Sequence, residues 1–222
     1  MSAARGYRTA AALALLAAAA VCPAGRARAQ ALPFEAVPFG GALFPMGKLV
    51  DQGGTTLAHR TSVVFGGRLD AWLWHWGGLE LAVTYAPSGF HATNSLGQSV
   101  DTTGGLFAAT GRVVLRFART GPVWWHVSAG GGVVIHSGTY LANLVSSGRQ
   151  SVAGVVGLTG RFQVSEGTAL VLTAESYLYS AKFSGIAGVT PAARFNSDVA
   201  VSLGVVVPLG ARGEEDDYRV IR

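Results

Sequence analysis

A single His-x-Ser triplet in this chain pairs a general base with a serine nucleophile. In His126-Val127-Ser128 the two reactive residues lie two positions apart, and in an extended strand such residues project from the same face. The imidazole could then activate the serine hydroxyl. A catalytic triad also needs a group that orients the imidazole, and no carboxylate is spaced for that role. We therefore predict that the chain is not an enzyme.

Metal ligands and cofactor motifs are equally scarce. The acidic run at residues 214–217 belongs to a charged tail, residues 211–222, and such runs are usually solvated chain ends. The glycine-rich segments lack the Gly-Lys-Ser of a phosphate loop. The five histidines show no i, i+4 or paired spacing typical of metal sites: His59, His75, His91, His126 and His136. We predict no metal and no cofactor.

The first 29 residues have the composition of a secretory signal peptide. Arg5 and Arg8 precede an apolar run over residues 9–21, and Ala27-Arg28-Ala29 offers a small-x-small cleavage site. The run is too short to cross a bilayer as a helix, which takes about 20 residues. We predict export, cleavage after Ala29, and one domain over residues 30–210 before the tail.

Removal of the signal peptide changes the charge of the chain. Four of the 17 basic residues and the only cysteine leave with it, all 12 acidic residues stay, and the net charge falls to +1. A near-neutral chain lacks the basic surface that nucleic-acid binding needs, so we predict no nucleic-acid partner. Charged residues make up 13% of the sequence, about half the usual quarter. The apolar surface must therefore be buried in a core or covered by lipid.

Eight segments alternate apolar with small or polar residues, a period of two that predicts β-strands. Long polar links follow the first, third, fifth and seventh segments, and short links follow the others. Long loops at one rim and tight turns at the other are typical of outer-membrane barrels. The predicted strands cover residues 34–45, 61–75, 78–87, 105–117, 123–135, 151–164, 167–181 and 196–209.

Each central segment has one face that is almost free of charge. In residues 105–117, Phe107, Val113 and Leu115 share one face, and Arg112 and Arg116 share the other. The outer face of a soluble barrel would carry scattered Lys and Glu, whereas this pattern suits an apolar face toward lipid and a polar interior. The predicted lumen polar cluster comprises Arg68, Asp70, Glu80, Arg112, Arg116, His126, Arg161 and Glu175.

Aromatic residues gather at the ends of segments that meet at the short-turn rim. Aromatic side chains at one height are typical of the girdle at a membrane interface. Packing in a soluble core is the alternative interpretation. The predicted girdle comprises Trp72, Trp74, Trp76, Phe117, Trp124 and Trp125.

On these features residues 31–210 resemble the small outer-membrane β-barrels of the OmpA and OmpX type. The resemblance rests on the signal peptide, the eight-strand rhythm and the alternating loop lengths. It implies an all-β, eight-stranded antiparallel transmembrane barrel in the cell outer membrane, surrounded by outer-membrane lipid. Two features depart from such families. Leu209 and Gly210 are followed by the charged tail rather than ending on a terminal aromatic residue, and no cell-wall-binding domain follows the barrel.

The leading functional hypothesis is a structural or surface-interaction role for the four long loops. Rigid scaffolds commonly display such loops for recognition, here toward an unidentified surface ligand or envelope protein. The loops carry isolated charges such as Lys48, Arg149, Lys182 and Arg194. A narrow pore is the main alternative. The charges in the lumen of so small a barrel are expected to pair and to block the lumen. If these ion pairs exchanged partners, they would open a gated path for ions.

Two further hypotheses belong to other classes of protein. A lipid A deacylase-like enzyme would use His126 and Ser128, although their parity places both on the predicted lumen face. A soluble, lipocalin-like periplasmic carrier would require the polarity of the two faces to be inverted.

Overall fold

The computed structural model describes residues 34–52, 54–93, 96–138, 149–165, 168–181 and 194–209. The predicted signal peptide, the charged tail and Lys182 lie outside these ranges. Regular structure within them consists of β-strands. No helix in the described part of the chain is long and apolar enough to cross a membrane.

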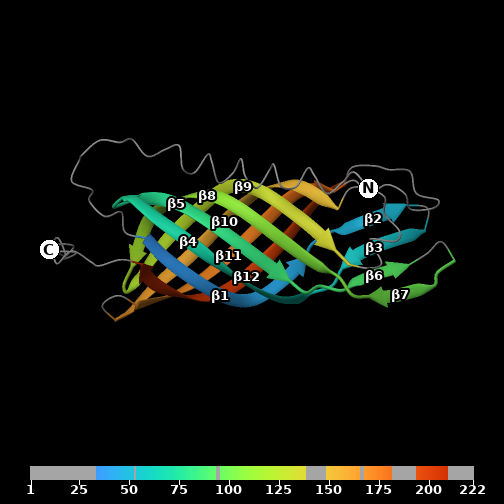
Figure 1. Cartoon of the computed structure of the whole chain (residues 1–222), viewed down its shortest axis with the longest axis horizontal. Coiled ribbons are helices and arrows are strands. Elements are labelled where there is room, and N and C mark those ends of the chain that lie inside the picture. The colour runs from blue at the N-terminus through green and yellow to red at the C-terminus, as the bar shows by residue number, and fades with distance from the viewer. Residues whose placement is uncertain are drawn as a thin grey trace, which may run out of the picture. The chain divides into compact units, whose positions relative to one another are not determined.

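Eight antiparallel strands close into a barrel (Figure 1). Strand β1 pairs with β4 on one side and with the last strand on the other, so the sheet has no open edge. The predicted eight-stranded antiparallel barrel is confirmed, and the strand ends lie within three residues of their predicted positions. The barrel strands are β1 (Phe34–Pro45), β4 (Ser62–Trp74), β5 (Gly77–Ala86), β8 (Gly105–Thr120), β9 (Val123–Ser137), β10 (Gln150–Ser165), β11 (Thr168–Ala181) and β12 (Arg194–Leu209).

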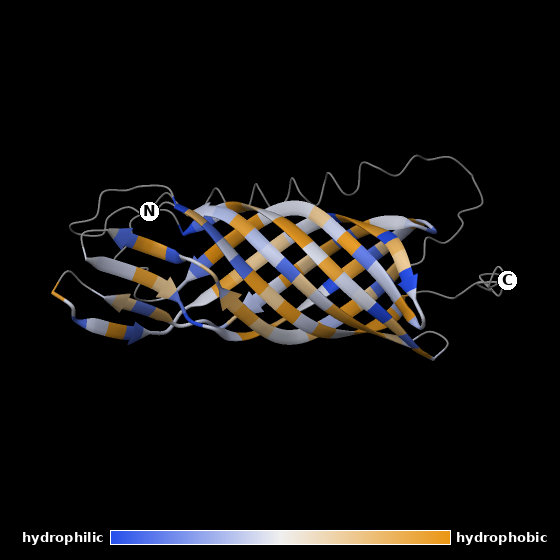
Figure 2. Ribbon diagram, turned by 180° about the vertical axis from the view of Figure 1, so that it is seen from behind, coloured by the Kyte–Doolittle hydropathy of each residue, from blue (hydrophilic) through white to orange (hydrophobic). Residues whose placement is uncertain are grey.

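Burial alternates along the barrel strands with a period of two, and apolar and polar residues alternate with it (Figure 2). In β5, Glu80 and Thr84 are buried, whereas Leu79, Leu81 and Val83 are about half exposed. Charged residues on the buried face and apolar residues on the exposed face are the polarity of a membrane barrel. Lipid hydrocarbon therefore surrounds these strands.

Two glycines on the inner side of β9 allow a close approach of β8. A Cβ atom at Gly130 would lie 2.1 Å from the backbone oxygen of Gly111, and one at Gly132 would lie 2.0 Å from that of Ala109. No side chain fits such a gap. The glycines therefore let the wall of this narrow barrel curve tightly.

The first two long links contain short strands that the sequence analysis did not predict. They form the hairpins β2 (Lys48–Gln52) with β3 (Thr55–His59) and β6 (Phe90–Thr93) with β7 (Ser99–Thr102). The hairpins join into one four-stranded sheet, β2-β3-β6-β7, which we call the extension. Short stretches of alternating buried and exposed residues explain why this sheet forms. Leu57 and His59 of β3 and Phe90 and Ala92 of β6 all bury their side chains on one face.

Candidate functional site

The interior of the barrel holds charged residues of neighbouring strands in cross-strand register. Glu35 of β1 lies opposite Asp70 of β4, Asp70 lies opposite Glu80 of β5, and Glu80 lies opposite Arg112 of β8. Each belongs to the inward set of its strand, because alternate residues of a strand share a face. One wall of the lumen therefore carries three adjacent carboxylates.

A bidentate ion pair closes the lumen toward the short-turn end. Arg161 of β10 donates to both carboxylate oxygens of Glu35, at 2.6 Å and 2.8 Å. The indole Nε1 of Trp72 donates to Glu35 Oε2 at 2.8 Å. All three side chains are buried. Two parallel guanidinium–carboxylate bonds are among the strongest and most directional polar contacts in proteins, so this arrangement fixes β1 against β10 across the barrel.

A second network has Glu175 of β11 at its centre. Arg112 donates a hydrogen bond to Glu175 and also lies 3.2 Å from Glu80 Oε1. Arg68 approaches Glu175 Oε2 at 3.5 Å, and the hydroxyl of Tyr177 donates to Glu175 Oε1 at 2.6 Å. The side chains of Arg68, Arg112 and Glu175 are almost fully buried. Paired charges of this kind can be buried in the lumen, whereas an unpaired buried charge would destabilise the barrel.

Above these ion pairs, toward the extension, the interior becomes aromatic and apolar. Tyr179 donates to Asp198 at 2.7 Å, and its oxygen lies 3.2 Å from Nε2 of His136. The rings of His136 and His59 are 5.0 Å apart, and His59 also contacts Phe90, with ring centroids at 4.3 Å. Leucine, valine and phenylalanine side chains surround this group in one buried cluster. The extension and the barrel therefore share one core.

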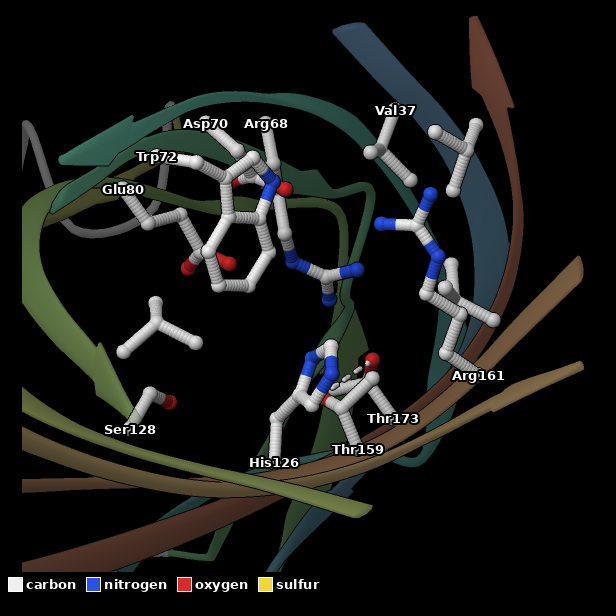
Figure 3. A pocket seen from close by; sticks show the side chains of 13 residues that line it. Val37, Arg68, Asp70, Trp72, Glu80, His126, Ser128, Thr159, Arg161 and Thr173 are labelled. Atoms are coloured by element: carbon white, nitrogen blue, oxygen red, sulfur yellow. Dashed lines mark hydrogen bonds between the residues drawn. The ribbon is translucent and has the colours of Figure 1, made fainter. Parts of the chain in front are cut away.

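A cavity of about 20 Å³ lies between the two ion-pair networks (Figure 3). Such a volume holds about one water molecule. Asp70 and Trp72 of β4, Glu80 of β5, His126 of β9 and Arg161 of β10 line it. Side chains from several strands thus surround this cavity.

The residues of the predicted lumen polar cluster divide between different contacts. Asp70 lines the lumen cavity, Arg116 is half-buried, and the other six are buried: Arg68, Glu80, Arg112, His126, Arg161 and Glu175. Arg161 joins the Glu35 pair, whereas Arg68, Glu80, Arg112 and Glu175 form the second network. Arg116 stacks over the Trp72 ring at 4.0 Å, and His126 meets the same ring edge-on at 5.4 Å. None of the ion pairs among the described residues includes Asp70.

Sequence reasoning missed several partners of these charges. Glu35 begins the first strand, and its alternation with Val37 and Phe39 is the signal that would have placed it inside. Tyr177, Tyr179 and Asp198 also share the inward parity of their strands. No pattern in the sequence indicates which of these groups pair, because the pairs join strands up to 134 positions apart, as in the Arg68–Ser202 hydrogen bond.

One member of the predicted aromatic girdle requires correction. Trp72 is only 8% exposed and donates to Glu35 inside the lumen, because it shares inward parity with Arg68 and Asp70. Trp74 and Trp76 are about half exposed and stack at 5.4 Å, and Phe117 is 57% exposed. Trp124 and Trp125 are half-buried. Trp74, Trp76 and Phe117 expose their side chains near the short turns, and their role in an interfacial girdle stays a prediction.

His126 and Ser128 lie in the lumen without the hydrogen bond that joins a general base to its nucleophile. Both residues line the lumen cavity rather than the lipid-facing surface (Figure 3). Nε2 of His126 has no hydrogen-bond partner among the described residues, and Ser128 is not bonded to it. A serine nucleophile needs such a base within hydrogen-bond reach. The described residues also contain no group of three or more His, Cys, Asp and Glu able to hold a metal ion.

No protein-family model and no curated protein matches the chain. Among solved structures, it is similar to the solid-state NMR structure of the outer membrane protein AlkL in DMPC bilayers, with 15% identity and a TM-score of 0.50 over 86% of this chain and 97% of AlkL. A weaker likeness is to Neisserial surface protein A, with 16% identity and a TM-score of 0.42 over 79% of this chain and 96% of that protein. Ail of Yersinia pestis gives 11% identity and a TM-score of 0.39 over 80% and 99%.

The closed antiparallel barrel, its apolar outer face and its polar lumen together define a small outer-membrane β-barrel protein. The AlkL likeness supports the same fold. The resemblance to barrels of the OmpA and OmpX type is therefore confirmed at the level of fold. The short turns of such barrels face the periplasm and the long loops face outward, which puts the extension on the outer side.

Proposed function

We propose that this protein is a closed barrel that presents the extension for surface interaction. The main support is that two of its long loops form an ordered sheet which shares a core with the barrel. Leu57 and Phe90 are 4% and 0% exposed on the inner face of that sheet. A surface held in its binding conformation before it meets a partner loses less entropy on binding.

The outer face of the extension carries small polar and charged side chains. Ala58, His91 and Asp101 lie opposite one another on β3, β6 and β7. Asp101 accepts hydrogen bonds from Arg60 at 3.0 Å and from His91 at 2.8 Å. The hydrogen bond from His91 and the nearby charge of Arg60 hold the pKa of Asp101 below its usual value. This face therefore offers ordered hydrogen-bonding groups to a polar ligand or an envelope protein.

The lumen supports this proposal over a pore. An ion path needs a continuous channel, whereas the described interior has paired charges at two levels, a cavity of about one water between them and an apolar cluster above. The geometry around His126 and Ser128 likewise gives no support to a lipid A deacylase.

Replacing the hairpin of residues 48–59 by a short turn tests the proposal. Wild type and variant would be compared in lipid vesicles, after heat-dependent gel migration has shown that both barrels are folded. Surface interaction predicts that binding to immobilised glycans and envelope proteins is lost in the variant, while single-channel conductance stays negligible in both. Equal binding by the two proteins, together with a large conductance of the wild type, would support the pore instead.

A further inference from the structure

Two arginines of β8, Arg116 and Arg119, lie at the short-turn end of the barrel. Arg116 stacks over the Trp72 ring at 4.0 Å and donates to the backbone oxygen of His75 at 3.0 Å. Arg119 stacks over the Trp124 ring at 5.0 Å and donates to a backbone oxygen of the next turn at 3.2 Å. Neither takes part in an ion pair among the described residues. A guanidinium group has five N–H donors, so both arginines keep donors for a further partner.

A β-bulge brings Arg119 to the lumen side of the wall. The register of β8 against β9 shifts between Arg116 and Ala118, where Phe117 is the extra residue, and after the shift Arg119 pairs with Trp124. Paired residues of neighbouring strands share a face, and Trp124 has the parity of the lumen residues of β9. In a regular strand Arg119 would share the lipid-facing parity of Phe117. Bulges commonly redirect a side chain in this way, and this one places both cations at the mouth of the lumen.

The carboxylates of the described residues do not balance these two cations. Asp51 and Asp101 are the exposed carboxylates of the described ranges, and both belong to the extension. Glu35, at the short-turn end of the lumen, already accepts hydrogen bonds from Arg161 and Trp72. The mouth of the lumen therefore presents positive charge toward the periplasm.

The chain itself supplies an anionic segment at this end of the barrel. Residues 214–217 read Glu-Glu-Asp-Asp, and the three arginines of the tail lie outside this run. The tail follows Leu209, where β12 ends at the short-turn rim beside the start of β1. In the closed barrel β8 is four strands from β12 in either direction, so the two arginines stand on the wall opposite the start of the tail.

The tail is long enough to cross the mouth of the lumen. Eight strands spaced about 4.8 Å apart and tilted by about 40° enclose a barrel about 16 Å across. An extended chain advances up to about 3.5 Å per residue, so the chain from Leu209 to Glu214 spans up to about 17 Å. Tethering also gives the run an effective concentration on the order of millimolar, so that ion pairs of ordinary strength suffice to hold it.

We propose that the acidic run of residues 214–217 binds Arg116 and Arg119 and thereby holds the tail across the periplasmic mouth of the lumen. Each guanidinium group lies with a flat face on a tryptophan ring, and the N–H donors along its edge suit carboxylate oxygens. The tail is then a docked part of the barrel rather than a solvated chain end. This contact lies on the periplasmic side and does not depend on what the extension binds.

Disulfide formation between introduced cysteines in phosphatidylcholine vesicles tests the contact, because the predicted mature chain has no cysteine of its own. Tyr218→Cys, beside the acidic run, is combined either with Thr120→Cys next to Arg119 or with Thr168→Cys on β11. Both wall positions are exposed, and β11 is the direct neighbour of β12. A solvated tail should react faster with the nearby cysteine at position 168. A docked tail should react about tenfold faster with the cysteine at position 120, the effect of two ion pairs of exposed strength.

The preference for position 120 must also depend on charge. We expect it to disappear in Arg119→Gln, in the neutral-run variant, and in 1 M salt, where the Debye length is about 3 Å rather than 10 Å. Glu166→Gln, at the one other carboxylate outside the described ranges, is the matched control and should keep the preference. The neutral-run variant carries Glu214→Gln, Glu215→Gln, Asp216→Asn and Asp217→Asn.

Two outcomes would overturn the proposal. One is a faster reaction at position 168 in the fully charged protein at low salt, which means that the tail is solvated. The other is a preference for position 120 that survives in the neutral-run variant, which means that another group occupies the two arginines. Heat-dependent gel migration shows that each variant is folded. The tail substitutions lie outside the barrel strands, so they decide the question even if Arg119→Gln does not fold.

Discussion

Replacing Arg161 by methionine tests how far the lumen ion pairs hold the barrel together. The side chain of Arg161 is 11% exposed and donates to both oxygens of Glu35, whose side chain is 10% exposed. Methionine retains much of the length of the arginine without its charge. In Arg161→Met, Glu35 keeps the Trp72 hydrogen bond and loses its cation.

The expected loss is large because the remaining charge stays buried. Removing one partner of a buried ion pair typically costs about 3–5 kcal/mol. Replacing both partners by neutral groups costs much less, since no unpaired charge is left. We therefore expect Arg161→Met to lower the free energy of unfolding by about 3–5 kcal/mol. The double variant Glu35→Gln/Arg161→Met should recover most of that loss.

Reversible urea unfolding in lipid vesicles, followed by tryptophan fluorescence, measures both values. Trp72 contacts the pair directly and reports its environment. The matched control is Arg60→Met, which removes a 3.0 Å ion pair whose side chains are more than half exposed. Exposed pairs contribute about 0–1 kcal/mol. A loss in Arg161→Met no larger than in the control, or a double variant no better than the single one, would refute the reasoning.

Three further predictions concern packing, the rim and the extension. Gly132→Ala places a Cβ atom 2.0 Å from a backbone oxygen of β8 and should abolish the heat-dependent gel shift, whereas Gly67→Ala, with open space around its Cβ, should retain it. Trp74 should be quenched by lipid-borne quenchers and Trp72 should not, because their exposed fractions are 55% and 8%. Burial and a neighbouring histidine lower the pKa of His59 from 6.5 to about 3. Between these two pH values the unfolded state therefore binds more protons than the folded state. The extension should therefore loosen as the pH falls through this range, seen as faster hydrogen exchange in β3 that His59→Phe suppresses.

The agreement of the predicted and observed barrel strands has a simple physical basis. A strand between lipid and a polar lumen must alternate, and residues 78–87 do so without interruption. The hairpins of the extension escaped prediction because strands of four or five residues give too few alternations. Trp72 was placed at the rim by its height along the strand, although its parity with Arg68 already indicated the lumen.

By itself, the sequence determined which residues lie inside the barrel, because side-chain direction in a strand follows from parity alone. It also indicated lipid outside, since the charged face and the apolar face are separate on each strand. Only the tertiary structure decided which charges meet. Closure of the barrel brings Glu35 to Arg161 across 126 positions and leaves Asp70 without a partner. Strand register and barrel curvature set those contacts, and both arise from all eight strands together rather than from any one segment.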